Sequence, residues 1–179
     1  MVYILLADGF EEIEALCPLD LLRRAGVETK LVSVTERKNV TGSHGITVSA
    51  DYTDTNDLKD MEMLVLPGGM PGAKTLDASP FVDGCIRHAV KNEAYLSAIC
   101  AAPMVLGHRK LLEGKRATCY PGFESELIGA TLVDAPAVRD GNVITGRGMG
   151  AAVDFGLLLV ETLKGKDAAD ALSRAIVYR

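Results

Sequence analysis

Tyr95-Leu-Ser-Ala-Ile-Cys100-Ala-Ala-Pro103 is the stretch that decides the fold. Residues 95–99 form an apolar run of strand character, and a helical pattern begins directly after Cys100 and runs to His108. A strand that breaks into a helix at one residue projects the side chain of that residue from a sharp turn. The side chain then lies at the carboxyl end of the sheet, where open α/β folds place their sites. Cys100 is therefore the candidate nucleophile.

The helix that follows Cys100 predicts an acidic thiol. Free N–H groups and the dipole at a helix N-terminus favour negative charge. A free cysteine has a pKa of about 8.5, and this position can lower it to roughly 3.5–7.5, which makes the thiolate the main species. The alternative interpretation is a small buried thiol that only fills the turn. Cys17, Cys85 and Cys119 lack such a turn and are expected to stay protonated.

Strand and helix patterns alternate along the rest of the chain. Strands are predicted over 2–6, 29–34, 63–66, 95–99 and 116–119, with hairpins over 40–49 and 137–145. Helices are predicted from Asp8-Gly9 to Arg24, from Ser79-Pro80 to Lys91, after Cys100, over 151–163 and over 167–174. Alternation of this kind implies an α/β fold with a mainly parallel sheet covered by helices on both faces. With 179 residues and no linker or repeat, we expect one domain over 1–179.

Composition and charge exclude several classes of protein. The net charge is −5 without a basic block, so no nucleic-acid partner is expected. No apolar run is long enough to span a membrane, and residues 1–7 resemble a strand rather than a signal peptide, so we expect a cytoplasmic protein without a membrane partner. The cysteines form no C-x-x-C pair and the three histidines show no metal-ligand spacing, so no metal is expected.

An acidic segment, Asp8-Gly-Phe-Glu11-Glu12-Ile-Glu14, follows the first strand. Acidic residues are common in a first helical turn because they complement the helix dipole, and this is the simpler interpretation. Pro18, however, cannot donate the helical hydrogen bond to the carbonyl of Glu14. Either the turn around Glu14 is loosened or the helix starts near Pro18, and both arrangements could point Glu14 toward the carboxyl ends of the strands. A carboxyl buried there would have a raised pKa and could donate a proton.

Two glycine-rich segments also follow strands. In Leu66-Pro-Gly-Gly69-Met-Pro-Gly72, the N–H of Gly69 could form an oxyanion hole with the N–H of Ala101, and the alternative is a tight turn alone. Gly146-Arg-Gly-Met-Gly-Ala151 fits the G-x-G-x-x-A dinucleotide fingerprint, but the chain lacks the strand and acidic residue expected about 20 residues on. We therefore interpret these last glycines as close helix–sheet packing and predict no cofactor.

Four motifs together resemble the DJ-1/ThiJ/PfpI family, specifically its DJ-1 branch, over essentially the whole chain. They are Asp-Gly-Phe-Glu-Glu-Ile-Glu14, Leu-Leu-Arg-Arg-Ala-Gly26, Leu-Pro-Gly-Gly69 and Ala-Ile-Cys100-Ala-Ala-Pro103. The resemblance implies a flavodoxin-like three-layer sandwich, usually a homodimer. It also implies a reactive Cys100, easily oxidised to sulfinate, that is hydrogen-bonded to a protonated Glu14. Activities of the branch are cofactor-independent glyoxalase (methylglyoxal to lactate), deglycation of glyoxal adducts, redox sensing and chaperoning.

The sequence departs from the family pattern at two positions. The protease and amidotransferase relatives place a histidine directly after the cysteine, and here Ala101 removes the obvious base of a cysteine peptidase. Several members of the branch carry a histidine where this chain has Tyr120. A phenol with a pKa near 10 is a poor base at neutral pH, although it can donate a hydrogen bond to a substrate.

The resulting hypothesis is a cysteine enzyme for small α-oxoaldehydes or their protein adducts. Cys100, Glu14 and Tyr120 are the predicted catalytic residues, and Gly69 and Ala101 the predicted oxyanion hole. Gly68, Arg24 and His44 are predicted to bind substrate, the last two near a site shared between two subunits. The alternative is a redox sensor or chaperone that signals through oxidation of Cys100, and a peptidase is the third option.

A homodimer is expected for a further reason. The predicted first helix carries more apolar side chains than one sheet face needs, and family members commonly pair through this region. These side chains are Leu16, Leu19, Leu21 and Leu22.

Overall fold

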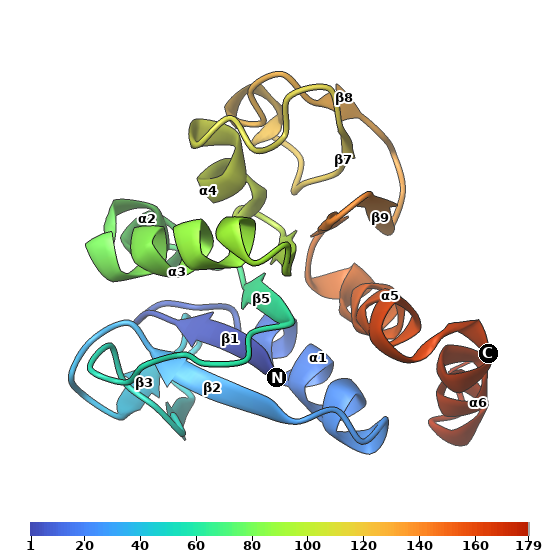
Figure 1. Cartoon of the computed structure of the whole chain (residues 1–179), viewed down its shortest axis with the longest axis horizontal. Coiled ribbons are helices and arrows are strands. Elements are labelled where there is room, and N and C mark those ends of the chain that lie inside the picture. The colour runs from blue at the N-terminus through green and yellow to red at the C-terminus, as the bar shows by residue number, and fades with distance from the viewer. Residues whose placement is uncertain (179) are drawn as a thin grey trace.

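A six-stranded sheet in the order β2-β1-β5-β6-β10-β9 forms the centre of the computed structural model, which describes residues 1–178 (Figure 1). Five strands are parallel, and β9 runs antiparallel to β10 at one edge. The strands are β1 (Val2–Leu6), β2 (Thr29–Ser33), β5 (Met63–Leu66), β6 (Tyr95–Ile99), β9 (Ala137–Asp140) and β10 (Val143–Gly146).

Helices cover both faces of this sheet, each over its own hydrophobic core. On one face lie α2 (Gly72–Ala78), α3 (Pro80–Lys91) and α4 (Pro103–His108), and on the other α1 (Glu12–Arg24), α5 (Ala152–Lys164) and α6 (Lys166–Ala175). Successive strand residues point to opposite faces, so that Tyr3 belongs to the first core and Ile4 to the second. The predicted three-layer α/β sandwich with a mainly parallel sheet is therefore confirmed.

Short elements complete the chain and include the main differences from the prediction. The hairpin of β3 (Asn39–Thr41) and β4 (Thr47–Ser49) is confirmed. The strand predicted over 116–119 is shorter, and as β7 (Arg116–Ala117) it pairs with the unpredicted β8 (Thr131–Leu132) outside the main sheet. Helix α2 and two short 3₁₀ helices, η1 (Glu124–Glu126) and η2 (Met149–Ala151), were also not predicted.

Helix α1 starts at Glu12 and continues through Pro18, so the alternative start near Pro18 is wrong. Glu11 caps the helix, because its side chain accepts a hydrogen bond from the Glu14 N–H at 2.7 Å. The cap and the first turn of α1 lie at the carboxyl end of β1, which brings Glu14 to the edge of the sheet where β5 and β6 also end.

Within residues 1–178, the structure contains no helix with the length and apolar character needed to cross a membrane.

Candidate active site

Cys100 occupies a strained turn between β6 and α4. Its φ is +66°, in the left-handed region that non-glycine residues adopt only at a cost of about 1–3 kcal/mol. Two backbone hydrogen bonds fix the turn: the Cys100 N–H donates to the Gly146 carbonyl at 2.9 Å, and the Cys100 carbonyl accepts from the Tyr120 N–H at 2.9 Å. The side chain is half-buried. The sharp strand-to-helix turn predicted from the sequence is therefore present.

The two predicted oxyanion-hole residues lie beside the sulfur. Hydrogen bonds from the Ala101 and Gly69 N–H groups act to lower the pKa of the Cys100 thiol. Gly69 needs its lack of a side chain, because its φ is +88° and a Cβ there would lie 2.3 Å from the Glu11 nitrogen. Both N–H groups thus converge where an anion on sulfur, or on an oxygen bound to the attacked carbon, would be stabilised.

Glu14 is fully buried next to Cys100. Its Oε2 accepts a hydrogen bond from the Gly68 N–H at 2.9 Å, whereas Oε1 is buried without a hydrogen-bond partner among residues 1–178. Burial is the main reason that the pKa of this carboxyl rises to about 7, and the charge of Glu11 adds to the effect. The sequence left open whether Glu14 only complements the helix dipole, and the structure instead places it against the candidate nucleophile.

Gly68 lies between the side chains of Glu14 and Cys100. A Cβ at Gly68 would lie 2.5 Å from Glu14 Oε2, 2.7 Å from Cys100 Cβ and 3.1 Å from Cys100 Sγ. The glycine therefore lets the carboxyl and the thiol approach each other. Its N–H is bonded to Glu14, so Gly68 shapes the site, and the predicted contact of Gly68 with substrate stays a prediction.

The Cys100 thiol and the Glu14 carboxyl influence each other's ionisation. Burial, and then the negative charge of Glu14, raise the pKa of the Cys100 thiol to about 12. The predicted lowering of this pKa is therefore wrong in direction, because the sequence showed the helix N-terminus but not the burial of the sulfur. With the pKa of Glu14 at about 7, the pair carries one negative charge over a wide pH range. These pKa values place the charge mainly on the Glu14 carboxylate, and it lies on sulfur only in the form that keeps the remaining proton on Glu14.

The other three cysteines lie outside the turn between β6 and α4, two of them buried and one, Cys17, half-buried. Burial raises the pKa of each to about 11. They are Cys17, Cys85 and Cys119, and the prediction that they stay protonated at neutral pH is confirmed.

Tyr120 lies next to Cys100 through its backbone. Its N–H bonds to the Cys100 carbonyl, while its side chain is half exposed and packs close to Gly148. The ring lines a cavity of about 490 Å³ together with Arg147, Met149 and Asp154. Cys100 and Glu14 do not line this cavity, so the catalytic role of the Tyr120 phenol stays a prediction.

Arg24 lies away from the site within one chain. It is ten residues after Glu14 on α1, which corresponds to about 15 Å along the helix axis, and its Nε donates to Asp20 Oδ2 at 2.6 Å. The predicted contact with substrate is therefore not made from the same chain.

His44 binds the start of α1 rather than Cys100. It lies between β3 and β4, where its N–H and its Nδ1 contact the buried carboxylate of Glu12 at 2.8 and 2.9 Å. The hydrogen bond to Glu12 raises the pKa of the imidazole. The sequence also missed that Glu11, Glu12 and His44 bring ligand atoms within 4.8 Å of one another. No linear spacing signals this, because Glu12 and His44 are 32 residues apart in the sequence.

The glycines of the fingerprint-like segment are only partly explained by packing. A Cβ at Gly146 would lie 2.9 Å from both Ile99 Cγ1 and Phe155 Cδ2, which confirms close helix–sheet packing there. Gly150 has open space around its Cα, so packing does not require a glycine at that position.

A cysteine on a strand-to-helix turn, facing a buried glutamate at the carboxyl edge of a flavodoxin-like sheet, defines a class of α/β proteins with a candidate nucleophile. The chain belongs to the DJ-1/PfpI family, whose model matches residues 1–162. The resemblance inferred from the four sequence motifs is thus confirmed.

Known relatives agree with this assignment. The chain is 37% identical over 99% of its length to protein DJ-1 homolog A of Arabidopsis thaliana, but spans only 46% of that protein. It is 31% identical to the glutathione-independent glyoxalase DJ-1 of Schizosaccharomyces pombe, with 98% of this chain and 97% of that protein covered. A crystal structure of a DJ-1 superfamily protein from Salmonella typhimurium superposes with a TM-score of 0.94 at 35% identity, covering 99% and 98% of the two chains.

Proposed function

We propose that this protein is a cofactor-independent enzyme that converts small α-oxoaldehydes, or their adducts on proteins, through Cys100 and Glu14. The observation that carries the proposal is the opposed pair of a half-buried thiol and a fully buried carboxyl, with two N–H groups directed at the sulfur. The S. pombe relative is named a glutathione-independent glyoxalase, which supports this class of substrate.

The proposed reaction begins with the proton of the pair on Glu14. The Cys100 thiolate attacks the aldehyde carbon, a C–S bond forms, and the carbonyl electron pair moves to oxygen. The Gly69 and Ala101 N–H groups stabilise that oxyanion until it takes the proton of Glu14 and becomes a hemithioacetal. Glu14, now a carboxylate, can act as a base toward the same carbon.

Proton transfer between carbons then completes the chemistry. Glu14 removes the proton from the former aldehyde carbon and returns it to the neighbouring carbon, while the hydroxyl proton of the first carbon passes to the oxygen of the second. The product is the thioester of a 2-hydroxy acid. Water hydrolyses the thioester and releases the acid, Cys100 and Glu14 in their starting state. Aldehyde and ketone carbons exchange oxidation levels internally, so the net reaction adds one water and needs no oxidant or reductant.

The direct test is lactate formation from methylglyoxal by the reduced protein, without glutathione and in the presence of a metal chelator. We expect the native chain to form many equivalents of lactate per protein molecule, and Cys100→Ser to form none above background. Cys85→Ser is the matched control, because Cys85 is buried on α3 and should not affect turnover. Absence of lactate from the native, reduced protein would contradict the proposal.

A redox sensor is the second candidate function. The strained turn leaves Cys100 partly accessible, and the N–H groups that stabilise an anion on sulfur would also stabilise the oxygens of a sulfinate. A peptidase lacks support, because Ala101 is buried at the position of the expected histidine, and His108 lies at the other end of α4 between two carboxylates.

We also propose that the protein forms a homodimer. The sequence-based reason is wrong for three of the leucines, because Leu19, Leu21 and Leu22 are buried within the chain. Two isoleucines nevertheless have about half of the side chain exposed: Ile13 on α1, and Ile46 beside β4, whose N–H donates to Glu12 Oε1 of α1 at 3.4 Å. Light scattering at micromolar concentration should give about twice the chain mass of 19.0 kDa.

The single domain over 1–179 and the cytoplasmic location stay predictions.

A further inference from the structure

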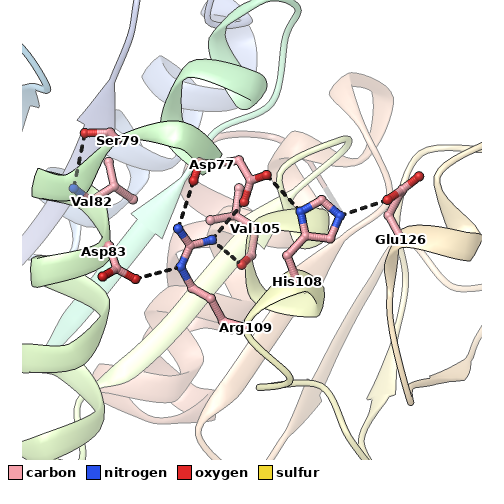
Figure 2. A network of polar contacts seen from close by, with 8 residues as sticks. All are labelled: Asp77, Ser79, Val82, Asp83, Val105, His108, Arg109 and Glu126. Carbon is pink, nitrogen blue, oxygen red and sulfur yellow. Dashed lines mark hydrogen bonds and ion pairs between the residues drawn. The ribbon is translucent and has the colours of Figure 1, made fainter.

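His108 lies at the centre of a polar network that joins four segments of the chain (Figure 2). It is the last residue of α4, and its two ring nitrogens point in opposite directions, each toward a carboxylate. Nδ1 is 2.8 Å from Asp77 Oδ2 on α2, and Nε2 is 2.8 Å from Glu126 Oε2 on η1. The ring therefore bridges α2 and η1.

Only a charged ring satisfies both contacts. A neutral imidazole has one N–H and one lone pair, so one of its nitrogens would face a carboxylate oxygen at 2.8 Å without a proton between them. The imidazolium donates to both carboxylates. In agreement with this geometry, the hydrogen bond to Glu126, followed by the one to Asp77, raises the pKa of His108.

The other charges around the ring are accounted for by neighbouring pairs. On its own segment, Arg109 donates to Asp77 Oδ1 at 2.8 Å and to Asp83 of α3 at 3.2 Å. Asp83 is also paired with Arg87. Asp77 is therefore shared between two cations, whereas His108 is the cation that the structure places on Glu126.

Glu126 is connected to the candidate active site through successive turns. Its N–H donates to the Phe123 carbonyl at 3.0 Å, and the Phe123 N–H donates to the Tyr120 carbonyl at 3.1 Å. The Tyr120 N–H in turn donates to the Cys100 carbonyl. The segment 120–126 thus runs alongside α4 and is held at both ends, by Cys100 before the helix and by His108 at its last residue.

The end of the segment 120–126 packs closely against helix α4. A Cβ at Gly107 would lie 2.1 Å from the Glu126 carbonyl oxygen, so the backbone of η1 rests directly on α4. Glu126 itself is about half exposed, and backbone contact alone does not fix the direction of its side chain.

We propose that His108 is a positioning residue for the candidate active site: its doubly hydrogen-bonded ring holds Glu126, and through it the segment 120–126 that places Tyr120 beside Cys100. The consequence for turnover rests on the proposed function, whereas the positioning itself does not. The device is sensitive to protonation, because loss of one ring proton removes one of the two contacts.

The sign of the pH dependence follows from the direction of the pKa shift. We call the two hydrogen bonds from the His108 ring to Asp77 and Glu126 the clamp. Because the pKa of His108 is higher in the folded chain than its ordinary value of 6.5, both hydrogen bonds of the clamp are present at pH values below 6.5. The clamp is lost as the pH rises through the folded-state pKa. The segment 120–126 is therefore held most firmly at acidic pH and less firmly toward alkaline pH.

Two measurements on the full-length protein test the proposal. The first is an NMR titration of the histidine rings, with the exposed His88 of α3 as internal reference. We expect both nitrogens of His108 to be protonated at pH 6, and Glu126→Gln to lower the midpoint. A His108 ring with one protonated nitrogen at pH 6 would overturn the proposal.

The second measurement is hydrogen exchange of the Phe123 and Glu126 amides as a function of pH, corrected for intrinsic rates. We expect protection to fall roughly two- to fivefold as His108 loses its proton, as for a partly exposed charged pair. The step should vanish in His108→Gln, while amides of β1 and β2 show none in either protein. A step of the same size in His108→Gln would contradict the proposal.

Glu126→Gln guards against a folding defect in the histidine variant. It alters a half-exposed side chain, so it should fold. Its amide can accept from a protonated Nε2 or donate to an unprotonated one, so the contact no longer depends on the ring charge and the pH step should vanish. An unchanged step in this variant would equally refute the clamp. Neither readout uses an aldehyde substrate, so failure of the proposed reaction leaves this test intact.

Discussion

Glu14→Gln is expected to lower the turnover of methylglyoxal by a factor on the order of 10²–10⁴, the usual contribution of a general acid–base group. The amide keeps most of the shape of the carboxyl, and its oxygen can still accept the hydrogen bond from the Gly68 N–H. It cannot move a proton between the two carbons of the substrate. Steady-state lactate formation, compared at equal concentrations of folded protein, measures the effect.

Glu11→Gln provides the matched control for this variant. Glu11 precedes Glu14 by three residues and its side chain caps α1, an interaction that the glutamine oxygen can keep. We expect its turnover to stay within about threefold of the native value, since a neutral cap costs only a few tenths of a kcal/mol more than a charged one. Normal turnover by Glu14→Gln would show that Glu14 is an ordinary first-turn glutamate, and the redox-sensor function would then be favoured.

Gly68→Ala is expected to reduce turnover by at least about 100-fold, because a shift on the order of 1 Å in a reacting group can cost that much. The added methyl would lie 2.5 Å from Glu14 Oε2 and 2.7 Å from Cys100 Cβ, so the carboxyl and the thiol must move apart. Overpacking of this kind also destabilises the fold by about 1–3 kcal/mol. Lactate formation and thermal unfolding measure the two effects.

Gly84→Ala is the control for the glycine substitution. Gly84 lies within α3, where a Cβ would meet only the end of the Arg87 side chain at 3.9 Å. Alanine favours a helix by about 1 kcal/mol over glycine, so this variant should be as stable as the native chain or more so, with unchanged turnover. Gly68→Ala with native turnover would mean that the separation of Cys100 and Glu14 is not critical, contrary to the proposed reaction.

Local sequence signals were sufficient for the fold and for the centre of the site. The apolar run at 95–99 predicted the strand β6, and the helical pattern that begins directly after Cys100 predicted the sharp turn. Both signals lie in one short stretch of sequence. The glycines after β5 predicted a second turn beside it, and the structure confirms that β5 and β6 are neighbours.

Properties that depend on tertiary distance could not be predicted in the same way. The pKa of Cys100 was misjudged because burial, its largest contribution, arises from packing that no single segment encodes. Within one chain, helix geometry places Arg24 at the far end of α1, so its predicted role at a site shared between two subunits depends on a partner chain and stays a prediction. The clamp of His108 joins residues 77, 108 and 126, which share no pattern in sequence.

The location of the single negative charge of the Cys100–Glu14 pair tests the account most directly. Ultraviolet thiolate absorbance of the native protein minus that of Cys100→Ser isolates this sulfur, because the other three thiols are present in both proteins. We predict that thiolate appears in the first ionisation of the pair with the remaining proton on Glu14, because the negative charge of Glu14, which helps burial to raise the thiol pKa to about 12, is absent while Glu14 is protonated. Thiolate that appears only in the second ionisation, toward pH 12, would place the charge on the carboxylate and contradict the proposed nucleophile.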